Sequence, residues 1–143
     1  MGRSVAFTDP TGRYFVFGHL FDMKEQKDLT AQRLSDINRI DFAQLPLQDA
    51  IKTVRGDGSR KLAVFSDPDC PYCKGLEGEL AKLDNVTVYT FLYPLEGLHP
   101  DAKGKSERLW CASNRAKAWS EFMTTGKLPN GPKCATPIER INQ

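Results

Sequence analysis

The sequence lacks the features that would point to a membrane or to a nucleic acid. No apolar run approaches the roughly 20 residues that a membrane-spanning helix needs. The N-terminus, Met1–Pro10, lacks the basic-then-apolar pattern of a signal peptide, and we expect such a segment to have been removed. The net charge is only +2 and the basic side chains are scattered, so we expect no nucleic-acid partner and no membrane insertion.

Histidine and cysteine are also scarce, at two and four residues. Cys70 and Cys73 form a close pair, but a zinc ribbon requires a second close pair, and Cys111 and Cys134 lie far apart. Neither histidine completes a zinc-finger spacing. We therefore expect no metal and no other cofactor. A purely structural bridge between Cys70 and Cys73 is disfavoured, because so small a loop constrains little chain entropy.

The chain is long enough, at 143 residues with 40% hydrophobic residues, to bury a core. Its first part predicts a β-hairpin, with β-rich segments at 5–8 and 13–18 around an Asp-Pro-Thr-Gly turn. Four aromatic residues of this hairpin are candidates for burial against a partner subunit or against the following helix. That helix is expected at 28–38, where a weak apolar stripe runs among polar residues.

The central part of the sequence predicts a strand, a helix and a second strand. The strands are expected at 62–65 and 86–92, where the chain is apolar and rich in β-branched or aromatic residues. Leu76, Leu80 and Leu83 are spaced to lie on one face of the helix between them. This order is a βαβ unit and predicts parallel pairing of the two strands.

Cys70 and Cys73 lie directly after the first of these strands and at the start of the helix. Unpaired backbone N–H groups and the helix dipole favour an anion there, which lowers the pKa of a thiol. Pro71 costs little in a first helical turn. A Cys70 thiolate attacks a disulfide, and Cys73 or another substrate thiol resolves the mixed disulfide. Asp67 and Asp69 would oppose the thiolate if unscreened, and we expect them to cap the turn or the helix start.

Cys111 and Cys134 are candidates for a structural disulfide, which would stabilise the fold by roughly 3 kcal/mol and indicate an oxidising compartment. Two free buried thiols are the alternative. Helices are expected at 101–112 and 115–124, with Trp110 and Trp119 in the core and His99 in a loop or capping role. Further on, Thr136 is expected to cap a helix whose first position is Pro137, rather than to begin a cis-proline loop.

Three segments carry a resemblance to a known family: Phe65–Cys73, Tyr93–Ala102, and Leu109–Cys111 with its spacing to Cys134. On these residues the sequence resembles the bacterial periplasmic disulfide isomerases of the DsbC/DsbG family. The resemblance implies a homodimer that reshuffles wrong disulfides in misfolded or unfolded secreted proteins and is kept reduced by a membrane thiol reductase of the DsbD type. It also implies that Cys70 is the nucleophile, Cys73 the resolving cysteine, and Cys111–Cys134 the structural bridge.

The fold class that follows is α/β: a thioredoxin-like domain with a helical insertion, preceded by a β-hairpin and a linker helix. We expect residues 1–27 to be a remnant of the dimerisation domain and 28–40 the linker helix. Residues 41–143 are then the catalytic domain, incomplete at its C-terminus. Pro71 and Tyr72 are expected to contact substrate. A chaperone-like binder of unfolded proteins and a dedicated dithiol oxidant are the alternative functions.

Overall fold

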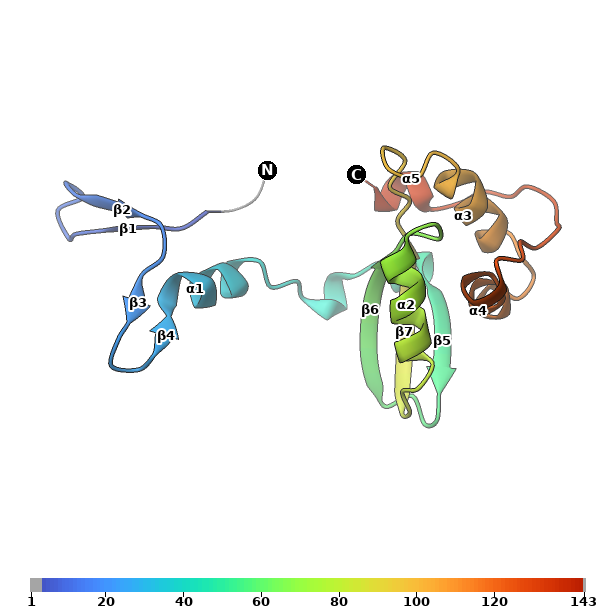
Figure 1. Cartoon of the computed structure of the whole chain (residues 1–143), viewed down its shortest axis with the longest axis horizontal. Helices are drawn as coiled ribbons and strands as arrows, with labels where there is room; N and C mark the ends of the chain where they lie inside the picture. The colour runs from blue at the N-terminus through green and yellow to red at the C-terminus, as the bar shows by residue number, and fades with distance from the viewer. Residues whose placement is uncertain (1–3, 143) are drawn as a thin grey trace. The chain divides into compact units, whose positions relative to one another are not determined.

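The computed structural model describes residues 4–142. They fall into two compact units that divide between Leu45 and Pro46 (Figure 1). The first unit contains two small antiparallel hairpins, a helix and a 3-10 turn. Its elements are β1 (Ala6–Thr8), β2 (Phe15–Phe17), β3 (Phe21–Asp22), β4 (Lys27–Asp28), α1 (Leu29–Ile37) and η1 (Phe42–Gln44).

The side chain of Asp9 organises the turn between β1 and β2. Its carboxylate accepts hydrogen bonds from the N–H groups of Thr11, at 3.2 Å, and Tyr14, at 2.8 Å. The Thr11 hydroxyl also donates to it, and this bond and that of Tyr14 are the main causes that lower the pKa of Asp9 to about 2. Gly12, at φ 68°, closes the turn in a conformation that favours glycine. The predicted hairpin is confirmed.

Helix α1 is also confirmed, and Asp28 caps it by accepting from the N–H of Ala31 at 2.9 Å. The His19 imidazole lies 2.6 Å from the same carboxylate. The pairing of β3 with β4 was not predicted, because two-residue strands leave no periodic pattern to detect. The aromatic residues of β2 remain exposed in this unit, and Phe17 is 80% exposed.

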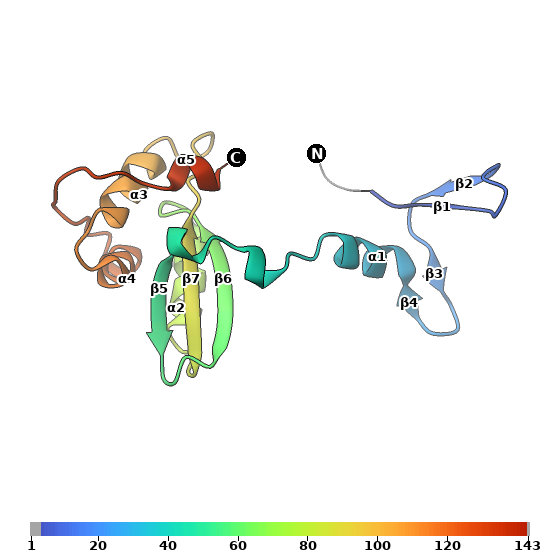
Figure 2. The same ribbon diagram turned by 180° about the vertical axis from the view of Figure 1, so that it is seen from behind.

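The second unit is built on a three-stranded sheet in the order β5–β7–β6. Strand β6 (Arg60–Ser66) runs parallel to β7 (Val86–Leu92), and α2 (Pro71–Leu80) connects them, so the predicted βαβ unit is confirmed. Strand β5 (Ile51–Arg55) pairs antiparallel to β7. It was missed because its residues, Ile-Lys-Thr-Val-Arg, form no continuous apolar run. Figure 1 shows α2 in front of the sheet, and Figure 2 shows the sheet from the opposite face.

The predicted apolar face of α2 is wrong in part. Leu80 is buried, at 6% exposed, and packs with apolar residues of β6 and β7. Leu76 and Leu83 are 44% and 38% exposed, and the helix ends at Leu80, so Leu83 lies outside it. Helical spacing placed the three leucines on one face only on the assumption that the helix continued past Leu80.

The remaining elements of this unit are η2 (Leu47–Asp49), α3 (Ala102–Trp110), α4 (Arg115–Thr125) and α5 (Ile138–Ile141). In both views the helices α3, α4 and α5 gather at the β5 side and at the end of the sheet (Figures 1 and 2). Trp110 and Trp119 are buried in a core cluster with Ile51, Leu92 and Ile138, which confirms their predicted place. Buried Asp49 binds Arg140 through two hydrogen bonds, at 2.6 and 3.0 Å, and so joins η2 to α5.

Helix α5 begins close to the predicted position but not in the predicted way. Its N-cap is Pro137, and no side chain caps it, so the expected cap by Thr136 is wrong. None of the peptide bonds in residues 4–142 is cis, and Thr136-Pro137 is therefore no cis-proline loop here. None of the helices in the same range is long and apolar enough to cross a membrane.

Candidate active site

The chain turns sharply between the end of β6 and the start of α2, and this turn carries Cys70. The carboxylate of Asp67 accepts the N–H of Asp69 at 2.7 Å, and the Cys70 N–H donates to the Asp67 carbonyl at 3.3 Å. Pro68 is buried within the turn. The predicted capping of the turn is confirmed for Asp67. The turn therefore sets the backbone of Cys70 before the helix begins.

Cys70 is the N-cap residue of α2, with an extended backbone at φ −70° and ψ 121°, and Pro71 follows in the first turn. Both Cys70 and Cys73 are free thiols and half-buried. The pKa of Cys70 is lowered chiefly by the backbone N–H of Cys73, against the opposing effect of burial. The Cys73 thiol and the Tyr72 N–H lower it further, while the charge of Asp67 acts to raise it. The helix N-terminus thus favours a thiolate at Cys70, as its position in the chain suggests.

Asp67 is buried, at 2% exposed, and its hydrogen-bond partners favour the ionised carboxylate. Burial alone would raise the pKa of Asp67, but hydrogen bonds from His99, Leu95 and Asp69 together bring it below its ordinary value. The Leu95 N–H donates to one carboxylate oxygen at 2.7 Å, and His99 Nδ1 lies 3.0 Å from the same oxygen. His99 was assigned a loop or capping role, and the structure places it against the turn that precedes Cys70.

Asp69 does not cap the helix; it forms an ion pair. Both of its carboxylate oxygens accept from Lys105 Nζ of α3, at 2.7 Å each. The sequence reasoning missed Lys105, because a lysine in the first turn of a helix is ordinarily a solvated side chain. The sequence did hold one indication: an unpaired Asp69 carboxylate next to a Cys70 thiolate would disfavour that thiolate, so a basic side chain could be expected to pair with Asp69.

Exposed apolar side chains occur in the segments on both sides of Cys70. Tyr72, between the two cysteines, is 89% exposed, and Pro71 is exposed beside it. Phe65 stacks on buried Phe91 at a centroid distance of 4.8 Å and is itself about half exposed. Pro71 and Tyr72 remain the predicted substrate contacts, and both are open to solvent.

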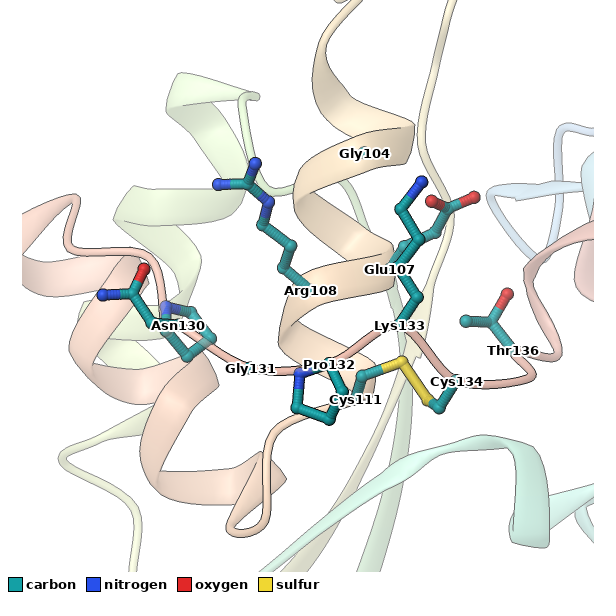
Figure 3. Close-up of a pocket in the computed structure, with 11 residues that line it drawn as sticks. Gly104, Glu107, Arg108, Cys111, Asn130, Gly131, Pro132, Lys133, Cys134 and Thr136 are labelled. Carbon is teal, nitrogen blue, oxygen red and sulfur yellow. A yellow bond between two sulfur atoms is a disulfide. The ribbon is translucent and has the colours of Figure 1, made fainter.

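Cys111 and Cys134 are joined by a disulfide that connects the end of α3 to the loop after α4. A cavity of about 620 Å³ lies against this bridge, away from the Cys70–Cys73 pair. Arg108 and Glu107 of α3 and Lys133 of the loop line it (Figure 3). No group of three or more metal-binding side chains occurs within residues 4–142.

Comparison with protein families identifies both units. Residues 47–143 match the model of the thioredoxin-like domain, and residues 1–31 match that of the disulfide bond isomerase N-terminal domain. The chain belongs to the thioredoxin-like family of DsbC disulfide interchange proteins. The predicted fold class is thereby confirmed, whereas the domain boundaries at 27/28 and 40/41 stay predictions.

Individual relatives carry names of the same family. A probable thiol:disulfide interchange protein DsbC of Bordetella parapertussis is 42% identical over 140 residues, which are 98% of this chain and 50% of the relative. The thiol:disulfide interchange protein DsbC of Escherichia coli K12 is 33% identical over 136 residues, covering 94% of this chain and 56% of the relative. The chain therefore spans about half the length of these relatives.

A solved structure agrees with this family. The disulfide interchange protein from Neisseria gonorrhoeae is 54% identical, with a TM-score of 0.65 over 67% of this chain and 69% of that one. The likeness extends to the fold and to a family whose members are named disulfide interchange proteins. It leaves the roles of Cys70, Cys73, Pro71 and Tyr72 as predictions.

Proposed function

We propose that this chain is a thiol:disulfide interchange protein that acts mainly as a disulfide isomerase, with Cys70 as its nucleophile. The observation that carries the proposal is the position of Cys70. It is a free, half-buried thiol at the N-terminus of α2, and its pKa is lowered by backbone N–H groups of that helix. The relatives' names support the same reaction class.

The reaction follows from this geometry. The Cys70 thiolate attacks one sulfur of a substrate disulfide, forming a mixed disulfide and releasing the other substrate sulfur as a thiolate. In isomerisation a second substrate thiolate attacks the mixed disulfide, and Cys70 leaves as a thiolate. In reduction Cys73 attacks instead, so that a Cys70–Cys73 disulfide forms and the substrate leaves with two thiols. Stabilising the thiolate makes Cys70 a good leaving group in the first route.

The setting of this reaction is also a proposal. The Cys111–Cys134 disulfide supports an oxidising compartment, which for this family is the bacterial periplasm. Substrates are misfolded secreted proteins, which Pro71 and Tyr72 contact. The exposed aromatic side chains of β2 support a homodimer through the first unit. A membrane thiol reductase of the DsbD type returns the Cys70–Cys73 pair to its dithiol form.

The test is alkylation of the reduced protein by iodoacetamide as a function of pH, with mass spectrometry to locate the modified cysteine. We expect Cys70 to react first, with a midpoint below the ordinary thiol pKa of about 8.5. Cys70→Ser should abolish recovery of a scrambled disulfide substrate, whereas Cys73→Ser should retain part of it. A Cys70 midpoint near or above about 8.5, as for an unperturbed thiol, would contradict the proposal. Brisk oxidation of a reduced substrate without isomerisation would identify a dithiol oxidant instead.

The exposed aromatic hairpin favours a second candidate, a chaperone-like binder of unfolded proteins. Replacing both Cys70 and Cys73 by Ala separates the two candidates. A binder retains its suppression of client aggregation in this double variant, whereas the loss of suppression would exclude a separate binding function.

A further inference from the structure

The turn before Cys70 is held by two side chains that come from outside its own segment. Asp67 accepts from the Leu95 N–H and is bound by His99, at sequence separations of 28 and 32. Asp69 is bound by Lys105 at a separation of 36. Both acids precede Cys70 by no more than three residues, so two distant points of the chain restrain the backbone that presents the nucleophile.

We propose that His99 and Lys105 are positioning residues of the exchange reaction, which hold Asp67 and Asp69 and thereby fix the turn that presents Cys70 to a substrate disulfide. The inference rests on the proposed function, because it concerns the same thiolate. Each residue acts through the carboxylate that it binds. Lys105 is partly buried, with 28% of its side chain exposed, so its charge is only partly screened by solvent.

The charge of these pairs matters as much as their geometry. An unpaired carboxylate beside a thiolate disfavours the thiolate, and Asp67 already acts in this direction on Cys70. Lys105 neutralises the second carboxylate, which is adjacent to Cys70 in the chain. The titratable side chains around the turn are Asp67, Asp69, Tyr72, Cys73, Lys74, His99 and Lys105. Without Lys105 the Asp69 carboxylate, next to Cys70 in the chain, would lose its cation, and without His99 the Asp67 carboxylate would lose one of its hydrogen-bond partners.

A double-mutant cycle on Asp69 and Lys105 tests the charge part in the full chain. The readout is the alkylation pKa of Cys70 in the reduced protein, with the Cys111–Cys134 bridge intact. Lys105→Met leaves Asp69 unpaired and should raise the midpoint by about 0.5 to 1 unit. Asp69→Asn leaves Lys105 unpaired and should lower it. The double variant removes both charges and should return close to the wild-type value.

The matched control is Lys103→Met. Lys103 lies on the same helix and pairs with Glu139 and Glu96 rather than with the turn, so its removal should leave the Cys70 midpoint unchanged. Lys105→Arg keeps a cation and should restore the wild-type midpoint. If one of the two single variants fails to fold, the direction of the midpoint shift in the other single variant still tests the proposal. Unchanged midpoints throughout, or shifts of one sign in both single variants, would overturn it.

His99 is tested by the rate of exchange with a model disulfide such as oxidised glutathione. His99→Ala removes the donor to Asp67 and should slow the reaction by about 3-fold to 10-fold, as a misplaced reacting group does. His99→Asn keeps an N–H donor and should recover part of the rate. A His99→Ala rate equal to that of the wild type would exclude His99 as a positioning residue.

These outcomes are separable from failure of the proposed function. If the wild-type chain itself shows an unperturbed Cys70 pKa and no isomerase activity, the proposed function is wrong, and a positioning role in that reaction is wrong with it. If the wild type is active and Lys105→Met behaves as Lys103→Met does, the function stands and the positioning role is wrong.

Discussion

Removing the Cys111–Cys134 bridge should destabilise the second unit by an amount that follows from its loop. The sequence separation of 23 gives about 3.4 kcal/mol at room temperature in the chain-entropy model. That is a large part of the roughly 5–15 kcal/mol by which a typical domain is stable. With a urea m-value of about 1–2 kcal/mol/M, the midpoint of unfolding should fall by about 2–3 M in Cys111→Ala/Cys134→Ala.

Tryptophan fluorescence reports this unit alone, because both tryptophans of the chain, Trp110 and Trp119, lie in its core. The matched control is Cys70→Ala/Cys73→Ala, which is compared with the wild-type chain in which Cys70 and Cys73 are free thiols. Cys73 packs against the same core cluster as Cys111, so the control accounts for lost sulfur packing while no loop is opened. We expect the control to change the free energy of unfolding by less than about 1 kcal/mol. Equal losses in the two double variants would refute the entropic argument.

Two further predictions concern backbone and charge, and urea titrations check both. Gly56→Ala should destabilise the fold by more than about 1 kcal/mol, because the φ of Gly56 is 56° and an added Cβ would collide with the Asp84 carboxylate. Gly78→Ala in α2 is the control: the added Cβ has no atom within 4 Å, and the change should stabilise the fold by up to ~1 kcal/mol. The lowered pKa of Asp67 stabilises the fold above its unfolded value of 3.8, and this contribution is lost as the pH falls through the lower folded value. Asp67→Asn should therefore be less stable than the wild type at pH ~7 by about 1–3 kcal/mol, with the difference shrinking in acid; a constant difference would argue against the ionised carboxylate.

The elements with a clear local signal were predicted from the sequence. Asp9 and Gly12 mark the first turn, and the alternating β-branched residues of Val86–Leu92 predict both ends of β7 correctly. The active-site turn is also encoded locally, because the side chain of an aspartate, here Asp67, can accept a hydrogen bond from the backbone N–H two residues later, here that of Asp69. These are interactions within a few residues, which sequence spacing represents directly.

Predictions that assumed a continuing local pattern were wrong or incomplete. Leu83 fits a helical spacing with Leu76 and Leu80, yet α2 ends at Leu80 because the chain must turn back into β7. Strand β5 has no apolar run of its own and becomes a strand only by pairing with β7. Thr136 has the right chemistry for a cap but makes no capping bond, and α5 is held instead by Asp49 and Arg140 across the fold.

By itself the sequence determined the order of strand, helix and strand, and with it the position of Cys70 at a helix N-terminus. That position depends on residues next to one another, and it suffices to favour a thiolate. Only the tertiary structure decided what surrounds that thiolate. It brings His99 and Lys105 to the two acids before Cys70 from 32 and 36 residues away, and no local periodicity encodes such distances. The reason is physical: charges act through space, and the folded chain alone sets which of them lie close.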